Sequence, residues 1–166
     1  MKKFIFMFLL AMVFNSFFGI TDSEIDQFLK TYKEEGYTFN EKISKYLWSV
    51  NFKSEDWEKG WDVYVYLSKN NDSPDYNLIY VFSILKSNLK TLPTELSEFL
   101  LNANQYDNNW GNYAISYNKD DTVNIYYIIK LLQNDVDKDI LVRAIGFNAG
   151  YSYSVVNTIN KLLGKK

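Results

Sequence analysis

Acidic side chains are the residues in this sequence whose spacing could support catalysis. Two adjacent pairs, Glu55–Asp56 and Asp120–Asp121, could supply the acid and the base of glycan hydrolysis. Both pairs lie in polar segments that predict loops, where neighbouring acids are solvated and nothing raises the pKa of one carboxyl selectively. The chain of 166 residues has no histidine and no cysteine, which removes the commonest general base and the thiolate nucleophile. We therefore expect a protein that is not an enzyme and has no cofactor.

A second acidic pattern is the alternation of Asp135, Asp137 and Asp139. Alternating carboxylates open a calcium-binding loop. Such a loop also needs glycine at its sixth position and glutamate at its twelfth, and here these places hold Ile140 and Gly146. Acids at the start of a helix stabilise the positive end of its dipole. We favour this second interpretation and expect no metal site.

Aromatic side chains offer binding rather than catalysis. The sequence has 14 Tyr, 12 Phe and 4 Trp, and tyrosine supplies apolar area together with a hydroxyl at little entropic cost. The alternative is that these rings fill the core of a sheet protein, because strands are enriched in aromatic residues. If several rings share one open face, they form an interaction platform. The candidate surface consists of Tyr64, Tyr66, Tyr113, Tyr117 and Tyr126.

A period of two predicts the strands that carry these tyrosines. The first three strands form an antiparallel meander, and the last two form a hairpin closed by the polar turn 118–121. The run 78–85 is apolar on both alternating sets, so we expect it to be central in the sheet or covered on both faces. The predicted strands are 46–52, 62–67, 78–85, 113–117 and 123–129.

Helical spacing predicts three helices around these strands. The first begins at 21–24 and ends near Gly36, the second begins at Pro93, and the third begins in the acids at 135–139. The order is therefore α-β-β-β-α-β-β-α, an α+β domain. One apolar stripe is expected to turn the third helix inward. It consists of Ile140, Ala144, Phe147, Tyr151, Val155, Ile159 and Leu162.

Two glycines interrupt this last helix, Gly146 and Gly150. Each costs about 1 kcal/mol relative to alanine in a helix, so a packing reason is expected. The small-xxx-small spacing allows close approach of a second backbone and hence self-association. The interpretation we favour is that both glycines relieve crowding where the helix crosses the sheet.

The first nineteen residues have the pattern of an export signal. Lys2 and Lys3 precede the apolar run 4–14. We predict a signal peptide over 1–19 and a single α+β domain over 20–166, in the periplasm or secreted. Phe17 lies where a signal peptidase prefers a small residue, so an uncleaved membrane anchor stays open as the alternative.

The charge balance argues against nucleic acid as a partner. The chain has 18 Lys and Arg against 20 Asp and Glu, whereas affinity for nucleic acid comes largely from basic contacts with phosphate. Arg143 is the only arginine, so at most one bidentate grip on a carboxylate or phosphate can exist. Contact with a membrane is expected only during export unless the leader is retained.

The element order, together with Leu101-Asn102-Ala103-Asn104 and Gly111-Asn112-Tyr113-Ala114-Ile115, resembles the YbjN family. This family has a type III secretion chaperone-like fold. The resemblance spans about residues 22–163. It implies an antiparallel five-stranded sheet with helices packed on it, no known catalytic residues and a role in binding proteins. It transfers no site residue by residue.

We expect a non-enzymatic, exported protein-binding domain of a chaperone-like or regulatory kind. Its sheet face or an edge strand would contact a protein partner or a second copy in a homodimer. The alternative function is a small-molecule or glycan binder that uses the tyrosine surface together with Trp57, Trp61 and Trp110.

Overall fold

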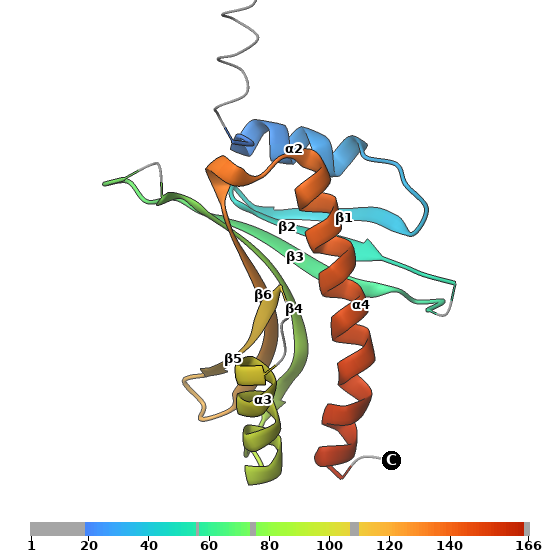
Figure 1. Ribbon diagram of the computed structural model, residues 1–166, viewed down its shortest axis with the longest axis vertical. Helices are drawn as coiled ribbons and strands as arrows, with labels where there is room; N and C mark the ends of the chain where they lie inside the picture. The colour runs from blue at the N-terminus through green and yellow to red at the C-terminus, as the bar shows by residue number, and fades with distance from the viewer. Residues whose placement is uncertain (1–18, 56, 74–75, 107–109, 165–166) are drawn as a thin grey trace, which may run out of the picture.

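The computed structural model describes residues 19–55, 57–73, 76–106 and 110–164 of the chain. The predicted leader over 1–19 lies outside these residues except for Gly19. Six antiparallel strands form one sheet in the order β1-β2-β3-β4-β6-β5 (Figure 1). The elements along the chain are α2 (Asp22–Thr31), β1 (Tyr37–Ser44), β2 (Leu47–Phe52), β3 (Trp61–Ser68), β4 (Leu78–Leu89), α3 (Thr94–Tyr106), β5 (Gly111–Tyr117), β6 (Val123–Leu132), η2 (Gln133–Asp135) and α4 (Lys138–Leu162).

The α+β class and the antiparallel sheet are confirmed, but the prediction of five strands is wrong. The additional strand is β1, which pairs with β2 at the edge of the sheet. Tyr37 is its only buried residue, so β1 lacks the apolar alternation by which a strand is recognised in a sequence. The first helix also ends earlier than expected, at Thr31. Gly36 has a φ of +84° and lies in the turn that leads into β1.

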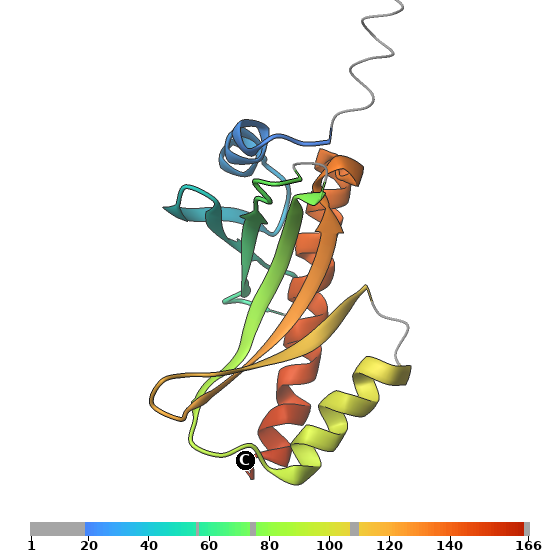
Figure 2. The ribbon, with the colours of Figure 1, turned by 90° about the vertical axis from the view of Figure 1, so that its left-hand side faces the viewer.

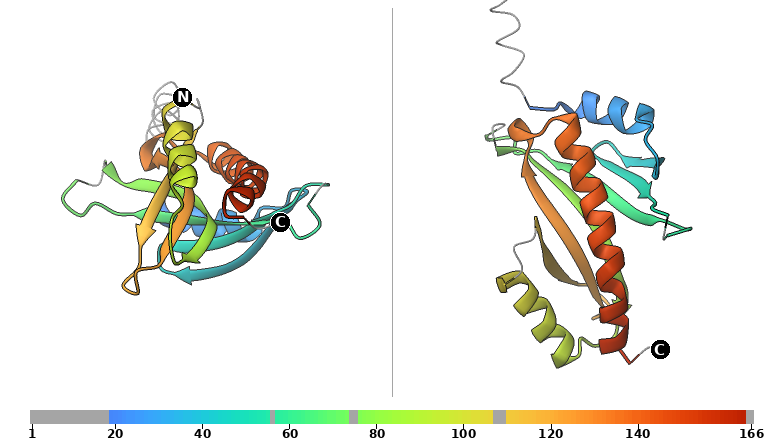
Figure 3. Two further views of the ribbon diagram at one scale, coloured as in Figure 1. Left: turned by 90° about the horizontal axis from the view of Figure 1, so that it is seen from below. Right: turned by 45° about the vertical axis from the view of Figure 1, so that its right-hand side comes forward.

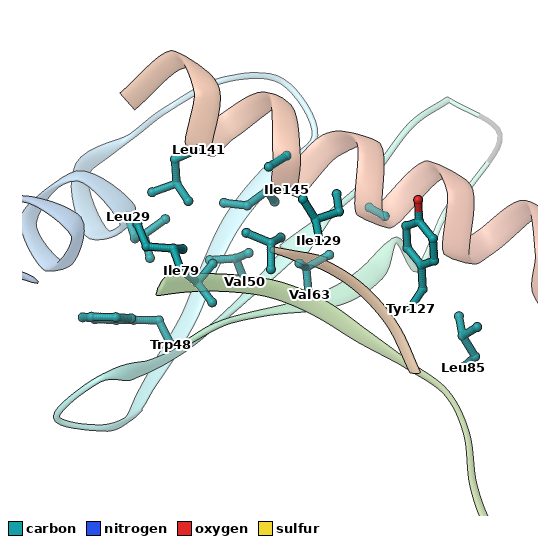
Figure 4. Packing of buried hydrophobic residues seen from close by; sticks show 14 of the residues in the cluster. Leu29, Trp48, Val50, Val63, Ile79, Leu85, Tyr127, Ile129, Leu141 and Ile145 are labelled. Atoms are coloured by element: carbon teal, nitrogen blue, oxygen red, sulfur yellow. The ribbon is translucent and has the colours of Figure 1, made fainter. Parts of the chain in front are cut away.

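The core lies between one face of the sheet and α4. Figure 4 shows Leu141 and Ile145 of α4 above side chains from the central strands. Val63, Val65 and Leu67 of β3 are fully buried there, as their alternation predicted. Burying aliphatic side chains of this size stabilises the fold by about 1.5–3 kcal/mol each. The other core residues of the strands include Trp48, Val50, Ile79, Val81, Ile125, Tyr127 and Ile129.

The three α-helices of the described residues lie on this face. Figure 3 shows α3 and α4 on the same side of the sheet, and α4 contacts β2, β3, β4 and β6. Phe99 of α3 packs on Tyr113 of β5. The inward-facing Trp48 meets α2, because its Nε1 donates to Asp26 Oδ1 at 2.8 Å. Among the described residues, the opposite face carries no helix (Figure 2).

Asp26 has three partners, and two of them, Trp48 and Lys42, join α2 to the sheet. Besides Trp48, it pairs with Lys30 and Lys42, each at 2.9 Å. These hydrogen bonds hold the pKa of Asp26 well below its ordinary value. The bond from Trp48 has the largest effect, followed by those from the two lysines. A depressed carboxyl pKa means that the interaction stabilises the folded state only while the group is ionised.

Replacing Asp26 is therefore expected to change acid stability. Asp26→Ala leaves the buried Trp48 indole N–H without its partner and should cost about 2 kcal/mol at pH 7. Asp26→Asn keeps an acceptor for the indole but loses the charge and should cost about 1 kcal/mol. The difference from the wild type should be constant above pH about 4 and shrink as the pH falls further. Urea unfolding between pH 2.5 and 7 measures it; a difference independent of pH would contradict this role.

The predicted stripe of α4 packs against the core except for Phe147, but the most deeply buried residues of the helix also include ones outside the stripe. Its fully enclosed residues include Leu141, Ala144, Ile145, Asn148 and Ser152, whereas Phe147 remains 38% exposed. Ala144 and Ile159 belong to the predicted stripe and are buried, but two polar side chains occupy positions that the apolar pattern excluded. Asn148 Nδ2 donates to the carbonyls of Val81 and Tyr127 at 3.0 and 3.2 Å.

The two glycines of α4 receive aromatic rings from β2 and from the loop that follows it. A Cβ at Gly146 would lie 3.3 Å from the ring of Phe52, and one at Gly150 would lie 3.4 Å from Trp57. Trp57 in turn stacks on Tyr153, with centroids 4.6 Å apart. Both glycines thus make room inside the domain, as the favoured interpretation predicted.

This packing separates the effects of a small and a large residue at position 150. Gly150→Ala is expected to stabilise the fold by about 0.5–1 kcal/mol, because the added methyl meets Trp57 at ordinary contact distance and alanine favours the helix. Gly150→Leu should destabilise it by about 1–3 kcal/mol, because the branched side chain displaces the indole. Thermal unfolding of both variants tests this; equal effects would mean that Trp57 does not cover position 150.

Candidate functional site

The helix-free side of the sheet carries a cluster of aromatic side chains. Alternate residues of β3, β4 and β6 point to this side, because their neighbours along each strand fill the core. Tyr64 stacks on Phe82 with ring centroids 5.3 Å apart, and Tyr66 stacks on Tyr80 at 6.2 Å. We call this surface the open face; it consists of Tyr64, Tyr66, Tyr80, Phe82, Tyr126 and Ile128.

The open face is hollowed over β3, β4, β6 and β5. The hollow has a volume of about 380 Å³ and a mainly apolar lining. Four aromatic residues, Tyr66, Tyr80, Phe82 and Tyr126, form one part of it. The rest of the lining consists of Ser68, Ala114, Ile115, Ser116 and Ile128. This volume falls within the range of about 300–1,000 Å³ that is typical of ligand pockets, and it is large enough for an apolar side chain of a partner. We call it the tyrosine hollow.

Three of the five predicted surface tyrosines lie together on the open face. Tyr64 and Tyr66 come from β3, and Tyr126 comes from β6, where its ring meets Phe82 at 6.1 Å. The placement of Tyr113 on this surface is wrong, because it is only 7% exposed on the helix side of the sheet. Tyr117 is 74% exposed, but the alternation along β5 assigns it to the side of Tyr113.

Tyr80 and Phe82 belong to the site although the sequence did not indicate them. They lie in the run 78–85, for which burial on both faces was one of two expectations. The strand is central, between β3 and β6, but only its inward set is fully enclosed; Ile84 of the outward set is 40% exposed. The register that places Tyr66 opposite Tyr80 and Tyr64 opposite Phe82 was the missing information.

One end of the open face is acidic. Asn40 and Asn51 donate to Asp62 Oδ1 at 3.2 and 2.9 Å, which fixes this carboxylate beside Tyr64. Burial, followed by the negative charges of Asp62 and Glu41, raises the pKa of Tyr64. Among the described residues, neither Asp62 nor Glu41 forms an ion pair. We call these two carboxylates the acidic end.

The edges of the sheet offer a less suitable binding site than its face. At β5, the Asn104 side chain of α3 accepts from Tyr113 N at 2.7 Å and donates to Tyr113 O at 3.0 Å. A backbone pair that an added strand would use is therefore already occupied. At β1, the register with β2 shifts twice, between Phe39 and Glu41 and between Lys42 and Ser44. Such irregularities and charges disfavour pairing with another chain.

Two of the acidic residues singled out for chemistry, Asp137 and Asp120, have structural partners. Asp137 caps α4 by accepting from Ile140 N at 2.7 Å, and Asp139 lies in the first turn, which confirms the helix-start interpretation. Side-chain and backbone hydrogen bonds from Thr122 lower the pKa of Asp120, opposite to what a general acid requires. Asp56 lies outside the described residues. Within the described part of the chain, no group of three or more acidic residues could hold a metal ion.

The tryptophans named for glycan binding do not join the tyrosines of the open face. Trp57 and Trp61 both contact Tyr153 of α4, on the helix side of the sheet. Trp110 is 55% exposed and stacks on Phe147 of the same helix, with centroids 5.7 Å apart. A single platform of tryptophans and tyrosines is therefore not formed.

Among the described residues, no helix has the length and apolar character needed to cross a membrane.

Comparison with solved structures shows that this chain is similar in fold to a secretion chaperone. No protein-family model and no curated protein matches the chain. The chain is similar to the type III secretion chaperone SycH of Yersinia pestis, whose crystal structure was determined in complex with a stable fragment of YscM2. The TM-score is 0.43 at 17% sequence identity, and the match covers 81% of this chain and 98% of that chain. Membership of the YbjN family stays a prediction.

Proposed function

We propose that this chain is a non-enzymatic protein-binding domain that acts through the open face. The observation that carries the proposal is an apolar, aromatic hollow on the side of the sheet that no described helix covers. Stacked tyrosine and phenylalanine rings give large contact areas with few rotatable bonds, which is typical of the centres of protein interfaces. The occupied backbone groups of Tyr113 and the shifted register of β1 favour the face over an edge strand.

The proposal includes a chaperone-like or regulatory role and membership of the YbjN family. The family resemblance rests partly on Leu101-Asn102-Ala103-Asn104. Asn104 has a specific task in the fold, because it joins the end of α3 to the backbone of β5. These two hydrogen bonds give a structural reason for an asparagine at position 104.

Export is a separate part of the proposal. A leader over 1–19 would be removed and the domain over 20–166 would act in the periplasm or outside the cell. Ile20 is 6% exposed, and its N–H donates to Val136 O at 3.0 Å. Intact-mass measurement of the protein recovered from the envelope of its native host tests this part. A chain that begins near Ile20 is expected, and a chain that retains Met1 would contradict cleavage.

Site-specific photo-crosslinking in the native host tests the binding function. p-Benzoylphenylalanine is placed at position 66 on the open face or at position 147 on α4, two sites of similar exposure at 41% and 38%. Illumination is expected to give a discrete protein adduct from position 66 and none from position 147. Equal adducts from both positions, or none from position 66, would contradict the proposal.

A further inference from the structure

We propose that the open face binds an amphipathic helix of a protein partner, which places an apolar side chain in the tyrosine hollow and a lysine or arginine at the acidic end. This inference rests on the proposed function and specifies the chemistry of the partner.

The architecture of the domain favours a helix as the occupant. A sheet with apolar residues on both faces is normally covered on both faces. In the described part of this domain, helices cover only one face of the sheet. An added strand would need an accessible sheet edge, but Asn104 occupies both backbone groups of Tyr113 in β5. A helix that packs on the open face needs no backbone pairing with an edge strand. It would complete an arrangement of three layers, helix, sheet and helix.

The negative charges on the open face favour a basic residue in the partner helix. Glu41 and Asp62 are exposed and form no ion pair with any described residue. The nearby loop after β2 contains two basic residues, Lys53 and Lys59, against three acidic ones, so it adds no net positive charge. A cation from a partner would therefore find uncompensated negative charge beside an apolar surface that limits screening.

The geometry of β3 sets the distance between the tyrosine hollow and the acidic end, and hence the spacing of the apolar and basic residues in the partner helix. Asp62 and Tyr66 lie on the same face of β3, four residues apart, which corresponds to about 13 Å at about 3.3 Å per residue. A helix rises about 1.5 Å per residue, so positions i and i+7 lie about 10.5 Å apart on one face. The long side chain of lysine or arginine spans the remainder. The expected pattern is an apolar residue at i and i+4 and a basic residue at i+7.

A phage-displayed library on a stable single-helix scaffold, randomised along one face, tests this pattern. Selection on the wild-type domain is expected to enrich the apolar i, i+4 and basic i+7 pattern. Selection on Glu41→Gln should lower the enrichment of lysine and arginine at i+7 by at least threefold, and the double change Glu41→Gln and Asp62→Asn should lower it further. Glu98→Gln, at an exposed position of α3, is the matched control and should leave the enrichment unchanged.

The outcomes distinguish this inference from the proposed function. Selected helices that lack a basic residue but lose binding to Tyr66→Glu would overturn the inference and leave the protein-binding face in place. Failure to enrich any helix would also overturn the inference, while crosslinking at position 66 would still test the face. Helices that bind Tyr66→Glu as well as the wild type would overturn both. Sedimentation showing a wild-type dimer that Tyr66→Glu dissociates would identify a second copy as the occupant and overturn the helix.

Discussion

Replacing Asn148 with leucine is expected to lower the free energy of unfolding by about 3 kcal/mol. Asn148 is fully buried on α4, where its amide donates to Val81 O of β4 and Tyr127 O of β6. Its Oδ1 accepts from Ser83 Oγ at 2.6 Å. Leucine offers none of these bonds and leaves buried polar groups unsatisfied, at about 1–3 kcal/mol for each group. Urea unfolding of the variant measures the loss.

Two further variants show whether the hydrogen bonds cause this loss. Ser83→Ala removes one donor to Asn148 and should cost only about 1 kcal/mol. Asn148→Asp places a carboxylate against two carbonyl oxygens, so its folded-state pKa should be raised. Its stability relative to the wild type should then fall as the pH rises above about 4. A loss for Asn148→Leu below about 1 kcal/mol would contradict the bridging role of Asn148.

Replacing Tyr66 with glutamate is expected to weaken binding of the selected helices by at least tenfold. Tyr66 lines the tyrosine hollow and stacks on Tyr80, so a carboxylate there removes apolar contact and must be desolvated when a partner binds. Because Tyr66 is 41% exposed, the free energy of unfolding should change by less than about 1 kcal/mol. Fluorescence anisotropy with a labelled selected helix measures the affinity.

Phe147→Glu is the matched control for this change. Phe147 is 38% exposed on α4 and stacks on Trp110, so the substitution adds the same charge at a similar exposure on the helix side. Binding should remain within about twofold of the wild type. A similar loss of affinity in both variants would mean that net charge, rather than the open face, governs binding.

The sequence predicted those elements whose apolar residues follow a regular period. β3 is the clearest example, because Val63, Val65 and Leu67 are all fully buried. β1 was missed because it lies at an edge and only Tyr37 is enclosed. Edge strands are stabilised by backbone pairing with one neighbour, and that pairing leaves no periodic mark in the side chains.

The buried face of α4 was predicted incompletely for a different reason. Asn148 and Ser152 are inside the core, but their polarity excluded them from an apolar stripe. Asn148 bonds to Ser83 and to strand carbonyls from other parts of the chain, and Ser152 donates to Asn148 Oδ1, so no local pattern specifies either burial. Phe147 was assigned to the stripe by its hydrophobicity and instead lies at the surface against Trp110.

The candidate site could be predicted only in part, because strand register decides which rings meet. Alternation alone placed Tyr64 and Tyr66 on one side of β3. Their stacking on Phe82 and Tyr80 follows from the pairing of β3 with β4, which no local pattern specifies. Tyr113 was included because it is a strand tyrosine, yet it faces α3 and α4.

Hydroxyl-radical footprinting of the protein inside its native host, compared with the purified protein, tests the open face most directly. If a partner covers this face, oxidation of Tyr66, Tyr80 and Tyr126 should fall in the cell relative to the purified protein. Oxidation of Phe147 and Trp110, on the helix side, should stay the same. Equal oxidation of the three tyrosines in both samples, or protection confined to Phe147 and Trp110, would contradict the assignment of the binding surface.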